Sequence, residues 1–300
     1  IPDGGQAPSP PRLSLATVSH LVAALEHRNA WHRQTAQRLL VERGDQETAD
    51  PLRTLIRTTK RPQACLHALW TLDRLKSLDE TTLLIALQHE HAAVREHAVR
   101  LSESRLDTVP TLLEKVLAMA RDEAMRVRFQ VALSLGAVSD RAAAVATLAT
   151  ILRRDGNDHW MRLAVMTSVP HDAVDLLAVI VDDEQVNADH HIHNAVLELI
   201  ELVGARGNPD EVLQVFRLMG RHTAGDATGA RVESLARLTQ GMARAGRSVR
   251  HFVAAHREGD GSLSDAIDAL LRDAAAVALD ERAVIPLRLD AVRLRGQADF

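Results

Sequence analysis

The sequence predicts an all-α protein, a right-handed α-solenoid built from about eight short helical hairpins. Hydrophobic residues make up 46% of the 300-residue chain, but aromatic residues only 2%. This composition favours helices packed through Leu, Val and Ala, because sheets contain more β-branched and aromatic runs. Apolar residues also recur at helical spacing: Val94, Ala98 and Leu101 lie at i, i+4 and i+7. Variants of this stripe return at regular intervals along the chain.

The repeat length can be read from an arginine that lies early in the second helix of several hairpins. Arg95 to Arg128 spans 33 residues and Arg128 to Arg162 spans 34, while Arg33 to Arg95 spans 62, or two periods of 31, with Cys65 between them. Such periods are typical of helical repeats. The tetratricopeptide type is disfavoured because the chain has no Tyr, and the Thr-Pro-Leu-His motif of ankyrin repeats is missing. The remaining interpretation is a short HEAT-like hairpin.

Caps and helix breakers set the expected helix boundaries. Asn29 suits an N-cap, Pro62 suits a first helical turn, where its missing N–H costs nothing, and Gly44 and Gly136 end helices. The expected pairs are 17–25 with 31–42, 47–58 with 62–75, 79–87 with 92–103, 108–120 with 124–135, 141–152 with 158–168, 171–181 with 188–203, 209–219 with 227–245, and 262–278 with 281–295.

Three segments follow from this pattern. Residues 1–13 are rich in Pro and Gly and are expected to form a linker. Residues 14–170 carry regular HEAT-like repeats, and residues 171–300 carry more divergent helical repeats punctuated by Gly. The last expected helix keeps an apolar face, whereas a solenoid normally closes with a polar cap. We therefore expect the array to continue beyond residue 300.

Charge and cysteine content exclude several classes of site. Thirty-six basic and 40 acidic residues give a net charge of -4, which argues against a nucleic-acid partner. The single cysteine, Cys65, excludes an internal disulfide, a thiolate zinc site and a Cys-x-x-Cys-His haem attachment within this chain. No run of about 18 apolar residues and no basic-then-apolar start occurs, so neither a transmembrane segment nor a signal peptide is predicted here.

Histidines are numerous, but they complete no catalytic or metal-binding pattern. His190 and His193, at i and i+3, share a helix face and are weak metal candidates, yet no His-x-x-x-His or Glu-x-x-His pair accompanies them. His89, His91 and His97 surround a turn without a nucleophile, an acid or a Gly-rich loop nearby. We therefore predict no catalytic, cofactor-binding or metal-binding residues in this chain.

The recurring arginines Arg33, Arg95, Arg128 and Arg162 are predicted to form a structural ladder, called here the arginine ladder. Each can lay its methylenes over the neighbouring repeat and offer its planar fork to a carboxylate there, with Asp122 and Asp158 as candidates. A ligand-binding row is the alternative, because the same fork suits a bound anion. The spacing follows the repeat, which favours the structural role.

The three tryptophans are expected to pack in the core or between repeats, as so few large aromatic side chains usually do. Trp31 and Trp160 open second helices, and Trp70 lies within one.

Four stretches together resemble one family, the large membrane-bound dehydrogenases of planctomycetes and their relatives that carry a c-type haem-binding module. These stretches are Trp31–Arg43 (WHRQTAQRLLVER), His67–Leu72 (HALWTL), Val94–Leu101 (VREHAVRL) and Trp160–Val165 (WMRLAV). In order and spacing they are similar to the HEAT-repeat segment that follows the β-propeller of that family. The resemblance covers residues 13–169 well and the remainder weakly.

The resemblance implies a non-catalytic scaffold or interaction segment of a larger exported redox protein, located in the periplasm. It implies neighbouring propeller and cytochrome modules as partners, with c-type haem elsewhere in the parent protein and no cofactor in this chain. The parent could be a sugar or alcohol dehydrogenase, whereas this chain would not be an enzyme. One alternative is a stand-alone α-solenoid that binds a protein or peptide. A second is an enzyme like the helical-repeat DNA glycosylases, which the slightly acidic charge disfavours.

Overall fold

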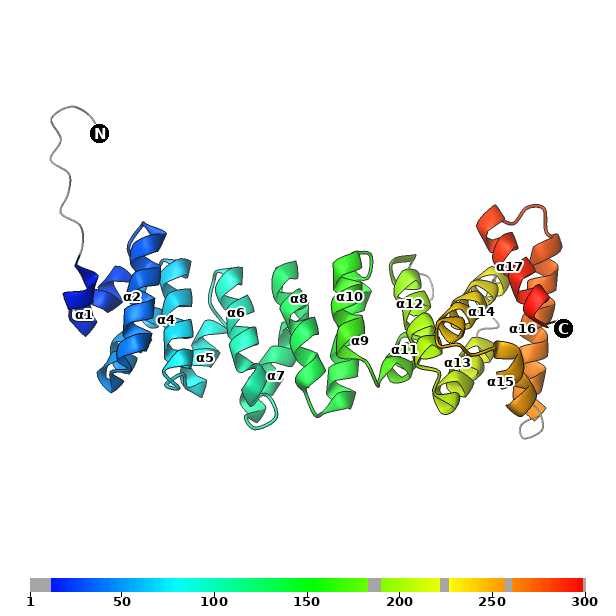
Figure 1. The fold of residues 1–300 in the computed structure, drawn as a ribbon, viewed down its shortest axis with the longest axis horizontal. Helices are drawn as coiled ribbons and strands as arrows, with labels where there is room; N and C mark the ends of the chain where they lie inside the picture. Colours follow the sequence, from blue (N-terminus) through cyan, green and yellow to red (C-terminus); the bar gives the residue numbers. More distant parts are fainter. Residues whose placement is uncertain (1–11, 183–189, 222–226, 257–260, 299–300) are drawn as a thin grey trace, which may run out of the picture. The chain divides into compact units, whose positions relative to one another are not determined.

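A computed structural model describes residues 12–182, 190–221, 227–256 and 261–298. Every regular element among these residues is a helix, and none of them forms a strand. Tertiary contacts divide the chain into unit 1, Ile1–Ser139, and unit 2, Asp140–Phe300. The predicted fold class, an all-α solenoid of helical hairpins, is confirmed (Figure 1). The expected linker at residues 1–13 lies almost entirely outside the described residues.

Unit 1 holds four helical hairpins. Its α-helices are α1 (Val18–Ala24), α2 (Ala30–Arg43), α3 (Ala49–Thr58), α4 (Pro62–Arg74), α5 (Glu80–Ala86), α6 (Ala92–Ser102), α7 (Pro110–Ala118) and α8 (Met125–Ser134). Short 3-10 helices lie at Leu13–Leu15, Gln46–Thr48, Glu103–Arg105, Met119–Arg121 and Leu135–Ala137.

Unit 2 holds nine α-helices among its described residues. These are α9 (Arg141–Asp155), α10 (His159–Ser168), α11 (Ala173–Val181), α12 (His190–Arg206), α13 (Pro209–Arg221), α14 (Ala227–Arg244), α15 (Val249–His256), α16 (Gly261–Leu279) and α17 (Ile285–Ala298).

The local signals in the sequence act as expected at several helix ends. The side chain of Asn29 accepts a hydrogen bond from the backbone N–H of Trp31, 2.9 Å away, and so caps α2. Gly44 ends α2 with a positive φ of 65°, a conformation that costs glycine little. Pro62 opens α4. One helix was not predicted: α15 is only eight residues long, barely two turns, too short to show a helical period clearly.

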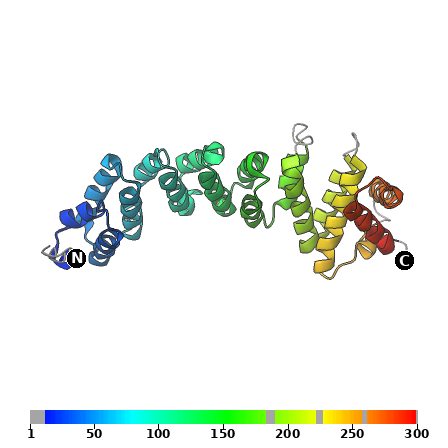
Figure 2. The ribbon, with the colours of Figure 1, turned by 90° about the horizontal axis from the view of Figure 1, so that it is seen from above.

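The helices of each unit pack in two rows. In unit 1 the second helices of the hairpins, α2, α4, α6 and α8, contact one another in sequence, and the first helices α1, α3, α5 and α7 do the same. Figures 1 and 2 show both rows from two directions. Leucine fills the space between them: Leu21, Leu40, Leu52, Leu69 and Leu83 are fully buried. Each hairpin therefore buries its apolar stripes against its neighbours, as a solenoid requires.

In unit 2 the same two-row order holds at first and then changes. Helix α11 packs on α9 and on α13, while α12 packs on α10 and on α14. Helices α16 and α17 then both pack against α14 and against each other. On α17, Ile285, Leu289 and Val292 are at least half exposed. This face is the apolar surface expected from the sequence, and continuation of the array past it stays a prediction.

Two glycines allow α12 and α14 to approach each other closely. A Cβ atom added at Gly241 would lie 2.2 Å from the carbonyl oxygen of Glu201, and one at Gly204 would lie 2.5 Å from that of Leu238. The obstructing atoms are backbone, which cannot rotate away. Gly204 follows directly after the expected helix 188–203, and Gly241 lies within the expected helix 227–245; in the structure both lie inside helices and set the distance between them.

Replacing Gly241 with Ala is expected to lower the free energy of unfolding by about 2–3 kcal/mol, because the added methyl group overpacks the contact with α12. Urea denaturation followed by circular dichroism measures the change. The matched control is Gly296→Ala in α17, where the added Cβ meets nothing within 4 Å. Equal effects of the two substitutions would contradict the close contact.

Candidate functional site: the arginine ladder and the second-helix surface

The members of the arginine ladder share one contact, made at the turn inside their own hairpin. Nη1 of each arginine donates to the carbonyl oxygens six and five residues before it. The acceptors are His27 and Arg28 for Arg33 (2.8 and 2.8 Å), His89 and Glu90 for Arg95 (2.8 and 2.9 Å), Asp122 and Glu123 for Arg128 (2.6 and 3.0 Å), and Gly156 and Asn157 for Arg162 (3.0 and 3.1 Å).

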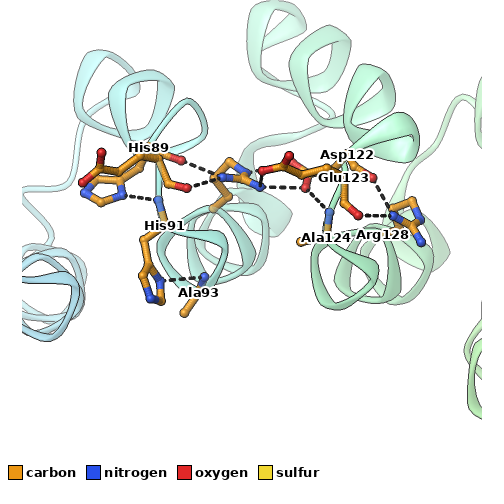
Figure 3. Close-up of polar contacts among 9 residues, drawn as sticks. His89, His91, Ala93, Asp122, Glu123, Ala124 and Arg128 are labelled. Atoms are coloured by element: carbon orange, nitrogen blue, oxygen red, sulfur yellow. Dashed lines mark hydrogen bonds and ion pairs between the residues drawn. The ribbon is translucent and has the colours of Figure 1, made fainter.

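Arg95 also links its hairpin to the next one. Its Nε and Nη2 donate to the two carboxylate oxygens of Asp122, both at 2.8 Å, and the same carboxylate accepts from the backbone N–H of Ala124 at 2.9 Å (Figure 3). The two side chains are only about a tenth exposed. Burial opposes ionisation of Asp122, but the bonds from Arg95 and Ala124 outweigh it and lower the pKa of this carboxyl.

Arg162 makes a similar link in unit 2, where its Nε donates to Glu198 of α12 at 2.9 Å. Asp158, the other predicted acceptor, caps its own helix by accepting from the backbone N–H of Met161 at 2.8 Å. The ladder arginines thus fix the turns of their own hairpins, and Arg95 and Arg162 also join neighbouring hairpins. Arg95, Arg128 and Arg162 are buried.

Cys65 occupies the ladder position between Arg33 and Arg95. Its side chain is fully buried, and this burial raises the pKa of the Cys65 thiol to about 12. Because the thiolate is the reactive form, the thiol is inert near neutral pH. The second hairpin therefore lacks the guanidinium that fixes the turn in the others.

The candidate histidines are placed separately. His193 of α12 bonds through Nε2 to the Glu233 carboxylate of α14 at 2.9 Å, whereas the side chain of His190 lies outside the described residues. Near the third turn, Nδ1 of His89 accepts from the backbone N–H of His91, and Nδ1 of His91 caps α6 by accepting from Ala93 (Figure 3). In the part of the chain that the structure describes, no three His, Cys, Asp or Glu side chains are arranged to hold a metal ion.

A row of side chains, of which only Trp70 was singled out from the sequence, lies five residues after each ladder position in unit 1. It consists of Arg38, Trp70, Arg100 and Leu133, one on each of the adjacent helices α2, α4, α6 and α8. We call it the second-helix row. Its arginines are exposed, Leu133 is 40% exposed and Trp70 is partly buried. The period of the ladder, applied to other positions in the helix, would have revealed it.

Trp70 is the best-anchored member of the second-helix row. Its Nε1–H donates to Nδ1 of His97 at 3.1 Å, and the guanidinium carbon of Arg100 lies 5.8 Å from the centroid of its ring. Burial lowers the pKa of His97, which keeps the ring neutral and Nδ1 available as the acceptor. Adjacent hairpins thereby hold an indole and a guanidinium in a defined position at the surface.

Trp70 packs between repeats as expected, but the same expectation is wrong for the other two tryptophans. Trp31 is 52% exposed and Trp160 is 68% exposed. Both occupy the second residue of a second helix, which faces away from the neighbouring hairpins, and each lies beside a single histidine ring, His32 or His159.

Comparison with known proteins supports the repeat type. Residues 18–101 match the HEAT repeats family. The X-ray structure of YibA from Escherichia coli is similar over 89% of this chain and 100% of that chain, with 17% sequence identity and a TM-score of 0.45. The comparison with curated proteins gives no match. Residues 18–101 are thus similar to HEAT repeats, and the described helices form an α-solenoid.

Substituting Arg95 with Gln is expected to lower the free energy of unfolding by about 3–5 kcal/mol, because it leaves the buried Asp122 carboxylate without its cation. Thermal and urea denaturation measure the loss. Arg38→Gln is the matched control: that arginine forms an exposed pair with Glu42, so its removal should cost only about 0.5 kcal/mol. Similar losses for both variants would show that the Arg95 pair is not special.

The His193–Glu233 pair predicts a pH dependence of stability. The bond to Glu233 raises the pKa of His193 although burial opposes it, and the bond to His193 lowers the pKa of Glu233. The protonated imidazole of His193 therefore adds to the free energy of unfolding. This contribution is fully present below the pKa of His193 in the unfolded chain, and it is lost as pH rises through the higher pKa in the folded chain. The carboxylate contribution is lost as pH falls through the lower folded pKa.

Wild type should therefore exceed His193→Gln in melting temperature by the largest margin at about pH 5–6, with a smaller margin at pH values of about 8. Melting curves across this range test the sign. A margin that grows with rising pH would contradict the ion pair.

Proposed function

We propose that this chain is a non-catalytic helical-repeat scaffold that binds protein partners, and that it connects the modules of a larger exported redox protein. The second-helix row is the observation that carries the scaffold role. HEAT repeats generally act as interaction scaffolds, and the match over residues 18–101 includes Arg38, Trp70 and Arg100 of that row. None of the described helices is long and apolar enough to cross a membrane.

The chemistry of the row suits a protein surface. Trp and Arg are the side chains that most often dominate binding energy at protein interfaces, and they do so when neighbouring groups hold them in place. His97 and Arg100 hold Trp70 in this way. Arg38 and Leu133 extend the same register to the adjoining helices, so a partner lying across α2, α4, α6 and α8 would meet charge, aromatic surface and aliphatic surface in turn.

The finer proposal, a redox parent protein, rests on the four stretches that resemble the planctomycete dehydrogenases. It places a sugar- or alcohol-oxidising propeller before this chain and a c-type haem module after it, in the periplasm. This chain would hold the two modules in position and would bind no cofactor itself. The complete open reading frame tests the proposal: coding sequence for neither module would leave a stand-alone protein-binding solenoid.

The double variant Trp70→Ala, Arg100→Glu is expected to weaken binding of the separately expressed propeller or haem module by about tenfold or more, as loss of interface Trp and Arg side chains commonly does. Calorimetric titration measures the affinity. The control is Arg57→Glu, the same charge reversal on the exposed side of α3. Equal binding by both variants would exclude the second-helix row as the interface.

The non-catalytic assignment has a separate test: oxidation of an aldose by the purified chain would overturn it.

A further inference from the structure

The first hairpin pairs with the second differently from the way the third pairs with the fourth. The residue that corresponds to Asp122, six before the ladder position, is Thr59 in the second hairpin. Its hydroxyl donates to the Glu26 carboxylate at 2.6 Å. Arg33 holds the turn carbonyls with Nη1 as Arg95 does, but its buried Nε has no hydrogen-bond partner among the described residues. Arg33 thus lacks the carboxylate that its counterpart engages.

A cavity of about 320 Å³ lies at this point, and we call it the Arg33 pocket. It is lined by the turn 25–28, by Arg33, and by Arg61, Gln63 and Ala64 at the start of α4. The volume exceeds that of several water molecules, each of which takes about 30 Å³ in the liquid, so it can admit a side chain.

Positive charge prevails in the Arg33 pocket. Three arginines, Arg28, Arg33 and Arg61, line it together with one acidic residue, Glu26. Within the described part of the chain neither Arg28 nor Arg61 forms an ion pair. Arg61 precedes the 13-residue helix α4 without capping it through its side chain, so the helix adds partial positive charge at the same place. The pocket therefore favours an anion.

The Arg95–Asp122 pair shows which anion the guanidinium edge accepts in this fold. There the two carboxylate oxygens take parallel bonds from Nε and Nη2, at 2.8 and 2.8 Å, which is the fork geometry that arginine presents to carboxylates. We propose that the Arg33 pocket binds an Asp or Glu side chain of a partner polypeptide, whose carboxylate offsets the excess of arginine there as Asp122 offsets the charge of Arg95.

This inference rests on the proposed function, since the acidic residue belongs to a protein partner, and it adds the chemistry that the partner must carry. The pocket lies at the hairpin turns, whereas the second-helix row follows the helices themselves. A partner that uses both would place an acidic residue at the turn between α1 and α2 while its apolar and polar surface contacts Trp70 and Arg100.

The test is a nuclear magnetic resonance titration of the intact, isotope-labelled chain. The probe is the blocked tripeptide acetyl-Gly-Glu-Gly-amide, and the signal is the Nε–Hε resonance of Arg33, assigned by its loss in Arg33→Lys. A saturable shift is expected with millimolar affinity, at least about tenfold stronger than with acetyl-Gly-Gln-Gly-amide, because only the carboxylate can take two charged bonds. Equal shifts with both peptides would overturn the proposal.

Two surface variants sharpen the test without removing the turn-fixing arginine. Glu26→Gln removes the carboxylate that competes in the pocket, so the Glu peptide should bind about threefold more tightly, as one nearby like charge commonly costs. The double variant Glu26→Gln, Thr59→Asp places a carboxylate in the chain at the position of Asp122 and should abolish peptide binding. Undiminished binding by this double variant would overturn the proposal.

Two further comparisons distinguish a carboxylate ligand from a phosphate ligand, and the pocket proposal from the proposed function. If acetyl-Gly-phosphoserine-Gly-amide binds more than about tenfold more tightly than the Glu peptide, the pocket is a phosphate site, and the carboxylate assignment fails. The peptide titration does not involve Trp70 or Arg100. If the second-helix row binds no partner, a positive peptide titration would still support the Arg33 pocket. If the peptide titration fails, the scaffold role is still tested by the Trp70 and Arg100 variants.

Discussion

The need to satisfy carbonyl groups at the hairpin turns constrains four hairpins of the described chain. Each hairpin reverses the chain within a few residues, and the last carbonyls before the second helix have no helical partner. Such groups cost free energy where they are shielded from water without a donor. One guanidinium supplies two donors at each of four turns, at Arg33, Arg95, Arg128 and Arg162, and its methylene stem packs along the helix. The turn is thereby fixed before any contact between hairpins is considered.

The Nε side of the same guanidinium determines how adjacent hairpins are joined. At Arg95 it engages Asp122 of the following hairpin, and at Arg162 it engages Glu198 of α12. At Arg33 the following hairpin carries Thr59 and Cys65 instead of an acid and an arginine. Small changes at two positions of the repeat therefore convert a closed ionic link into a basic cavity, while the helices around it keep their packing.

Much of this architecture could be predicted from the sequence because the signals are local and repeated. Arg95, Arg128 and Arg162 recur at the repeat period, and Asn29 and Pro62 mark helix starts through backbone chemistry alone. The pairing of His193 with Glu233 could not be predicted, because the two residues lie on different helices and no periodic pattern connects them. The helix at 249–256 was missed because it is too short to show a period.

Other errors came from reading a residue type without its surroundings. The glycines of the second half of the chain were interpreted as punctuation, since glycine usually weakens a helix, yet at Gly204 and Gly241 the missing side chain is what the packing requires. Trp31 and Trp160 were expected in the core or between repeats because large aromatic side chains are usually buried, but their position in the second helix faces solvent. In both cases tertiary contacts override an average preference.

The close approach at Gly204 and Gly241 also has a mechanical consequence. Helices separated by leucine side chains can roll and slide as those side chains change rotamer. With backbone against backbone near the C-terminal end of each helix, α12 and α14 lack that freedom, and this contact acts as a stiff joint. Under a pull on its ends, unit 2 would stretch at the softer contacts on either side of this pair, so elasticity is distributed unevenly along the array.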